Sequence, residues 1–183
     1  MVELVVLLLV IVGSMCIIGQ TAHTLRPRKN QDAEESIREM VKLFDSASRH
    51  IEIVTDLAPE FFANPSLLDS FEKAAKRGVQ IRLVYDPNGY KLNEVEGLEK
   101  LVKAGLIKAV EAKQAFTKEK DRHVMEIDGT WARLETYHPA KQMVEAAAKA
   151  RIYRSPVIAR FAEEEFKRQW EHSIGHNDDG AGD

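Results

Sequence analysis

Two hydrophobic periods alternate along the chain and predict helices and strands in turn. The segment AEESIREMVKLFDSASR carries apolar side chains at helical spacing from Ile37 to Phe44, with acidic residues in its first turn. This pattern predicts an amphipathic helix over residues 33–49. The apolar run HIEIVTDL follows and predicts a buried strand over residues 51–56.

The same order then repeats. Residues 66–78 have the pattern of a helix that ends at a glycine, and residues 79–87 that of a strand closed by a proline. A further helix is predicted over residues 92–105 and a shorter third strand over residues 107–112. Alternating strands and helices predict a mainly parallel sheet with right-handed crossovers.

The last third of the chain changes the pattern. RHVMEIDGTWARLET contains two strand-like runs around Asp128-Gly129, a pair that favours a two-residue hairpin turn. Residues 150–156 predict a last strand, and residues 157–173 predict a closing helix. The fold class is therefore α/β: a mixed, mainly parallel sheet with flanking helices and a β-hairpin. The apolar residues of the closing helix that we expect to cover the sheet are Ile158, Phe161, Phe166 and Trp170.

The amino terminus predicts a membrane anchor. Residues 4–25 contain no Asp, Glu, Lys or Arg, and about 20 such residues cross a bilayer. Glu3 precedes the run where a signal peptide has a basic start, and no small-x-small cleavage site follows it, so we expect an uncleaved transmembrane helix. Arg26, Arg28 and Lys29 follow the run, and the positive-inside rule places the folded domain in the cytoplasm.

Composition adds limits more than functions. Of 183 residues, 44% are hydrophobic and 30% charged, which suits one domain after the anchor. A net charge of -3 gives no overall attraction to nucleic acid. Cys16 is the single cysteine, which excludes an internal disulfide and a zinc site built on paired cysteines. The predicted division is an anchor over residues 1–25, a linker over 26–34, a domain over 35–173 and a disordered tail over 174–183.

The predicted domain resembles a phospholipase D-like domain. The resemblance rests on SASRHIEIVTD, FEKAAKRGVQIRLVYDP, DRHVMEIDG and RIYRSPVIARFAEEEFKRQWEHS. It implies a phosphodiester ligand, either a phospholipid or a nucleic acid. It also implies chemistry without a metal or other cofactor, in which one histidine attacks phosphorus and another protonates the leaving group. Short members of this family, with one motif copy, work as homodimers.

The hairpin departs from the family motif HxKxxxxD. When Asp128-Gly129 is matched to the motif's Asp and the following Gly, Asp121 takes the His position and His123 the Lys position. When His123 is matched to the motif's His instead, Met125 and Thr130 replace Lys and Asp. We prefer the first register, because the Asp-Gly turn fixes where the hairpin bends. The resemblance then implies a degenerate motif, since nucleophile and cation are both changed.

Polar residues of the second hairpin strand suggest a pocket. Arg133, Glu135 and Tyr137 alternate and share one face of the strand, and His138 follows. If that face looks toward His123, they would form an anion pocket in which Glu135 orients a base. The alternative is a solvated hairpin with cross-strand pairs. Candidate catalytic residues are His123, Asp128 and His138, and candidate ligand-binding residues are Asp121, His123, Arg133, Glu135 and His138.

Two weaker signals stay open. Asp56 and Asp86 end the first two parallel strands, where ligands of open α/β sheets bind, but Asp is also ordinary in turns. With Asp121 and His123 they are scattered candidates for a divalent cation; we expect no metal. Basic residues at 73–82 and 160–168 are mixed with acidic ones, which is typical of solvated helix faces. A membrane-facing basic side is the alternative.

Three functions remain. The first is a membrane-anchored domain that binds a phosphodiester or phosphorylated ligand with little or no turnover. The second is an active homodimeric phosphodiesterase, a nuclease or a phospholipase. The third is a structural interaction domain without a working pocket.

Overall fold

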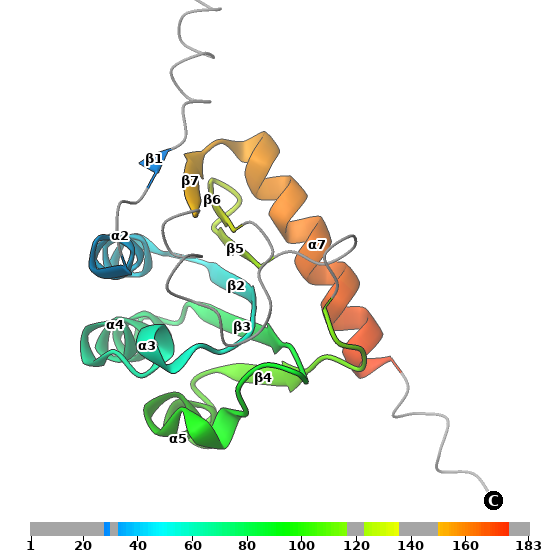
Figure 1. Cartoon of the computed structure of the whole chain (residues 1–183). Helices are drawn as coiled ribbons and strands as arrows, with labels where there is room; N and C mark the ends of the chain where they lie inside the picture. Colours follow the sequence, from blue (N-terminus) through cyan, green and yellow to red (C-terminus); the bar gives the residue numbers. More distant parts are fainter. Residues whose placement is uncertain (1–27, 30–32, 117–122, 136–149, 176–183) are drawn as a thin grey trace, which may run out of the picture.

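The computed structural model describes residues 28–29, 33–116, 123–135 and 150–175 of the chain. They form one seven-stranded mixed sheet with helices on both faces (Figure 1). Within these residues no helix is long and apolar enough to cross a bilayer. The predicted anchor lies outside them.

The first half of the domain has the predicted order of helices and strands. Strands β2, β3 and β4 pair in parallel, as the alternating order predicted. The long third helix of the prediction is a 3-10 turn followed by a shorter α-helix. The elements are α2 (Ala33–Ser46), β2 (His50–Thr55), α3 (Pro59–Phe62), α4 (Pro65–Lys76), β3 (Gln80–Tyr85), η1 (Leu92–Glu94), α5 (Glu96–Lys103) and β4 (Lys108–Glu111).

The second half extends the sheet on the other side of β2. The strand order is β1-β7-β6-β5-β2-β3-β4, so the hairpin pairs antiparallel with the first parallel strand. Strand β1 lies within the predicted linker and pairs antiparallel with β7. The remaining elements are β1 (Arg28–Lys29), β5 (Val124–Ile127), β6 (Trp131–Leu134), β7 (Arg151–Arg154) and α7 (Pro156–Ile174).

The hairpin bends at Asp128 and Gly129, as predicted. Both have positive φ, 57° and 71°, the signature of a type I′ turn. The N–H of Thr130 donates to the carbonyl of Ile127 at 3.1 Å. The ladder, however, pairs Ile127 with Trp131, so the loop has one residue more than predicted. Thr130 is that extra residue, as in a β-bulge.

Two apolar layers hold the helices to the sheet. On one face α2 and α4 pack through residues such as Phe44 and Phe71 against Ile53 and Leu83. On the other face α7 is the one helix among the described residues that packs against the sheet (Figure 1). It meets the sheet with its buried residues Ala159, Ala162, Phe166 and Gln169.

The expected role of Phe161 is wrong, because its side chain is 42% exposed. It precedes Ala162 by one residue, about 100° around the helix from the buried stripe. Phe166 is fully buried, and Ile158 and Trp170 are partly buried, as expected.

Charged side chains are buried under α7. Glu52 and Glu126 are direct cross-strand partners on β2 and β5, and neither is more than 2% exposed. Glu52 pairs with Arg82, whose guanidinium lies 5.2 Å from the ring centroid of Phe166. Glu126 pairs with His50, with Nε2 and Oε2 2.7 Å apart. Each buried carboxylate therefore has a basic partner, the condition for burying charge.

Candidate functional site

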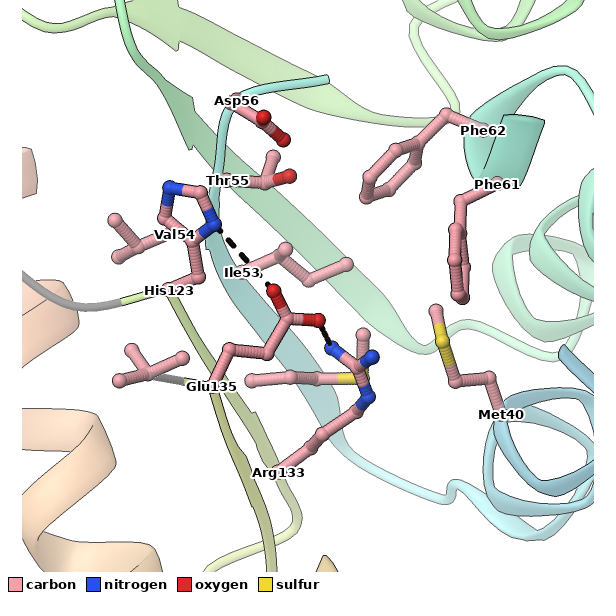
Figure 2. Close-up of a pocket in the computed structure, with 12 residues that line it drawn as sticks. Met40, Ile53, Val54, Thr55, Asp56, Phe61, Phe62, His123, Arg133 and Glu135 are labelled. Carbon is pink, nitrogen blue, oxygen red and sulfur yellow. Dashed lines mark hydrogen bonds and ion pairs between the residues drawn. The ribbon is translucent and has the colours of Figure 1, made fainter. Parts of the chain in front are cut away.

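A small pocket lies where β2 ends and β5 begins. The strands are antiparallel, with Val54 opposite Val124, so the last residues of β2 lie beside the first residues of β5. The cavity volume is about 20 Å³, which is room for the centres of one or two water-sized groups. The pocket is lined by Met40, Ile53, Val54, Thr55, Asp56, Phe61, Phe62, His123, Val124, Met125, Arg133 and Glu135 (Figure 2).

His123 lies in this pocket against a carboxylate. The residue is 5% exposed, and its Nδ1 is 3.4 Å from Oε2 of Glu135. The backbone joins the same two residues, because the N–H of Glu135 donates to the carbonyl of His123 at 3.0 Å. The edge of the imidazole meets Phe116, with ring centroids 6.0 Å apart. Carboxylate, backbone and aromatic ring together fix the orientation of the imidazole.

Arg133 shares the carboxylate of Glu135. Its Nη1 pairs with Oε1 of Glu135 (Figure 2). Its Nη2 donates to Oγ of Ser36 on α2 at 3.1 Å. The guanidinium also lies over the ring of Phe61, 5.6 Å from its centroid. Its Nε is buried and has no hydrogen-bond acceptor among the described residues. A buried N–H of this kind calls for a water molecule or a ligand oxygen.

The end of β2 forms another wall of the pocket. Asp56 is buried, and its carbonyl accepts a hydrogen bond from the N–H of Tyr90 at 2.9 Å. Gly89 approaches so closely that a Cβ there would lie 2.5 Å from the Asp56 oxygen. Asp86 has a different role, because its Oδ1 caps a turn at the N–H of Asn88, 2.9 Å away. In the part of the chain that the structure describes, no His, Cys, Asp and Glu cluster is arranged to hold a metal ion.

Asp128 does not belong to this pocket. It follows the far end of β5 from His123, roughly 17 Å along the strand. Its carboxylate accepts from the backbone N–H groups of Ser48, Arg49 and His50, at 2.8, 2.8 and 3.0 Å. Burial would raise the pKa of Asp128, but these hydrogen bonds together hold that pKa below its usual range. These hydrogen bonds attach the hairpin turn to the start of β2.

The structure brings together three of the candidate ligand-binding residues, His123, Arg133 and Glu135. Arg133 and Glu135 share one face, as alternation predicted, but the solvated-hairpin alternative is wrong for them, since they are only 7% and 8% exposed. Asp121, Tyr137 and His138 lie outside the described residues, so their place is untested. Met125 faces the same pocket beside Arg133, its cross-strand partner.

Sequence reasoning missed one side of the pocket. Ser36 and Met40 come from α2, and Phe61 and Phe62 come from the short helix α3. A polar residue one turn before Met40 on the apolar stripe was a signal for Ser36. The Phe61-Phe62 pair between two prolines was a signal for a packed turn. Neither signal indicates which strand the residues would meet.

The fold described above is similar to that of several solved structures. Neither family models nor curated protein sequences match the chain. Among solved structures, Nuc from Salmonella typhimurium, a phospholipase D family member, superposes with a TM-score of 0.58 at 17% identity, covering 80% of this chain and 96% of Nuc. NucT from Helicobacter pylori gives 0.57 at 15% identity, covering 76% and 89%. The chain has a phospholipase D-like fold.

A third solved structure with a similar fold is that of a DNA-binding protein. TrmBL2, an archaeal chromatin protein with a novel mode of DNA binding, gives a TM-score of 0.58 at 15% identity. The match covers 87% of this chain, which spans only 59% of the TrmBL2 chain. Identities this low establish only the fold. A function for this chain therefore has to be argued from the residues of the pocket.

Proposed function

We propose that this chain is a phospholipase D-like domain that binds a phosphodiester or another phosphorylated ligand at the His123 pocket, with little or no hydrolysis. The observation that carries the proposal is Nε of Arg133, a buried guanidinium donor without an acceptor among the described residues, in a pocket that also contains an imidazole. Guanidinium groups bind phosphate oxygens through charge-assisted hydrogen bonds. The imidazole of His123 adds a second N–H donor.

The same residues argue against efficient hydrolysis. Glu135 neutralises Arg133 through an ion pair, which weakens the guanidinium as a partner for charge that develops on a phosphoryl group. In the preferred register Asp121 stands in the nucleophile position and His123 in the cation position. A carboxylate there is a weaker nucleophile toward an anionic phosphodiester than an imidazole. Binding therefore fits these residues better than turnover.

We also propose that residues 1–25 hold the domain at a membrane, with the domain on the cytoplasmic side. The support is the uncharged run at residues 4–25 and the basic residues that follow it. Membrane attachment and ligand binding are separate parts of the proposal, because the first depends on the amino-terminal segment and the second on the pocket.

Thermal unfolding of the full chain in detergent tests ligand binding. The probes are bis(p-nitrophenyl) phosphate and inorganic phosphate, compared with chloride at equal ionic strength. At ten times its dissociation constant a probe stabilises the folded state by about 1.4 kcal/mol, a rise in melting temperature of about 3–6 °C. We expect that rise in the wild type and in His172→Ala, which removes an exposed histidine of α7, and none in His123→Ala. An equal response in all three would overturn the pocket assignment.

An active homodimeric phosphodiesterase is the second candidate. One observation favours it: the match covers 96% of Nuc and 89% of NucT, so the chain is similar in length to these two neighbours. It requires self-association and turnover that depends on His123. The DNA-binding neighbour TrmBL2 adds nucleic acid to the ligands to be tried. A structural interaction domain, the third candidate, would show no response to any phosphorylated probe.

A further inference from the structure

The first two turns of α7 expose large apolar side chains beside basic ones. Val157 is 76% exposed and Phe161 42%. One turn apart, they share a face of the helix. Just before α7, Arg154 at the end of β7 is exposed. We call this surface, made of Arg154, Val157 and Phe161, the α7 entry surface. The guanidinium of Arg154 lies 5.4 Å from the ring centroid of Trp131, a contact that holds it at this end of the sheet.

The chain enters the domain next to this surface. β1 pairs with β7 so that Arg28 lies opposite Ile152 and Lys29 opposite Arg151. Of the two β1 residues, Arg28 is therefore nearer to the end of β7 where α7 begins. Figure 1 shows β1, β7 and the start of α7 at the same end of the molecule.

The tether before β1 is short. Two residues, 26 and 27, separate Leu25 from Arg28, so their Cα atoms lie at most roughly 11 Å apart. If residues 4–25 cross a bilayer, β1 and the neighbouring β7 edge cannot lie far from the bilayer surface. The exposed apolar and basic residues closest to that edge are then the ones that contact the bilayer surface.

We propose that the α7 entry surface rests on the anionic cytoplasmic face of the membrane that holds the anchor. This inference rests on the proposed membrane attachment and not on ligand binding. Val157 and Phe161 insert among the lipid headgroups, which removes their apolar side chains from water. Arg154 complements the negative charge of that leaflet. The proposal gives the exposed start of α7 an occupant that the short tether brings to it.

The proposal also orients the pocket. Along β7, Arg151 lies opposite Leu134 at the pocket end of the sheet, and Arg154 lies opposite Trp131 at the turn end. His123 is thus separated from the start of α7 by a strand length, roughly 13–17 Å. With α7 starting at the bilayer, the pocket lies at the end of the sheet away from it. Its ligand then comes from the aqueous phase, not from the headgroups of the same bilayer.

Fluorescence quenching in vesicles tests the surface. Cys16 is the single cysteine, so Cys16→Ser gives a background in which Phe161→Cys or Val157→Cys carries an environment-sensitive label. Lys100→Cys on α5, whose side chain is 71% exposed, is the matched control. The full chain is reconstituted into phosphatidylcholine vesicles with or without 30% phosphatidylserine (roughly the charge of an anionic leaflet), containing spin-labelled lipids as quenchers.

We expect quenching at positions 157 and 161 at least twice that at position 100, increasing with phosphatidylserine. Equal quenching at all three positions would overturn the surface. Quenching at 157 and 161 that does not change with phosphatidylserine content would overturn the part assigned to Arg154. Flotation of the vesicles after an alkaline wash reports on the anchor separately: a chain that does not float overturns the anchor and this surface together, and leaves ligand binding at His123 standing.

Discussion

At the scale of single residues, the two motif candidates of the hairpin have different roles. His123 lies in the pocket with Arg133 and Glu135, while Asp128 fastens the hairpin turn to the start of β2. Asp128 has positive φ, which aspartate tolerates better than most residues. An aspartate before Gly129 therefore has a structural role that does not depend on catalysis.

Replacing Asp128 tests this structural role. Asp128→Ala removes the acceptor for three backbone N–H groups and should lower the free energy of unfolding by about 1–3 kcal/mol. Because the pKa of Asp128 is lowered in the fold, its contribution is present above its unfolded pKa and is lost as the pH falls through the folded pKa. Urea titrations at pH 7 and pH 3 should therefore show a larger effect at pH 7. Asp69→Asn, in an exposed pair with Lys73, should show neither effect.

The buried pair of Arg133 and Glu135 gives a second prediction. Glu135→Ala leaves an uncompensated buried guanidinium and should cost about 3–5 kcal/mol in the free energy of unfolding. The double variant Arg133→Met with Glu135→Leu removes both charges and should recover most of that loss, but should not bind phosphate. Denaturation with urea measures the first effect and the thermal response to phosphate the second. A double variant that still responds to phosphate would contradict the role of Arg133.

Sequence reasoning reached these residues unevenly. Alternation put Arg133 and Glu135 on one face, and the hairpin brought that face to His123. It could not show that α2 and α3 cover the face, because that depends on how distant segments pack. Ser36 and Phe61 were therefore missed, and burial of the charged pair was not expected.

At the scale of elements, the hydrophobic periods predicted the strands and helices around the pocket except the short helix α3. The errors concern which side of an element is buried. In α7 the apolar residues 157, 158 and 161 form a broad stripe, and periodicity does not say which edge of it meets the sheet. The sequence patterns assigned no role to the charged residues Glu52 and Glu126 of β2 and β5. They are buried because α7 covers the face that a two-layer fold would leave open.

The contact between α7 and the sheet should respond to pH through Glu126. Burial raises the pKa of Glu126, against the opposing effects of the Gly129 N–H and His50. A raised pKa means a contribution to stability that is present below the unfolded pKa and lost as the pH rises through the folded pKa. Glu126→Gln lacks this loss. Its free energy of unfolding minus that of the wild type should therefore be higher at pH 8 than at pH 4.

Urea denaturation at the two pH values measures the difference. Glu96→Gln, on the exposed face of α5, is the control and should show no such trend. A Glu126→Gln difference that shrinks toward pH 8 would mean that the His50 pair, and not burial, dominates at this carboxylate.

At the scale of the whole molecule, the site exists because two kinds of sheet meet. The parallel strands β2, β3 and β4 end where the antiparallel strands β5 and β6 begin or end. The sequence predicted both kinds of strand. It left their order open, because local patterns do not say whether the hairpin joins β2 or β4. Pairing of β5 with β2 is what places His123 beside Asp56.

The central claim is a phospholipase D-like pocket that binds phosphate groups with little or no hydrolysis. Nitrophenolate release from bis(p-nitrophenyl) phosphate tests it most directly, with the full chain and EDTA, at a probe concentration that raises the melting temperature. We predict no release above that of His123→Ala. Release that resists EDTA and disappears in His123→Ala, but persists in His172→Ala, would contradict the account and establish an active phosphodiesterase.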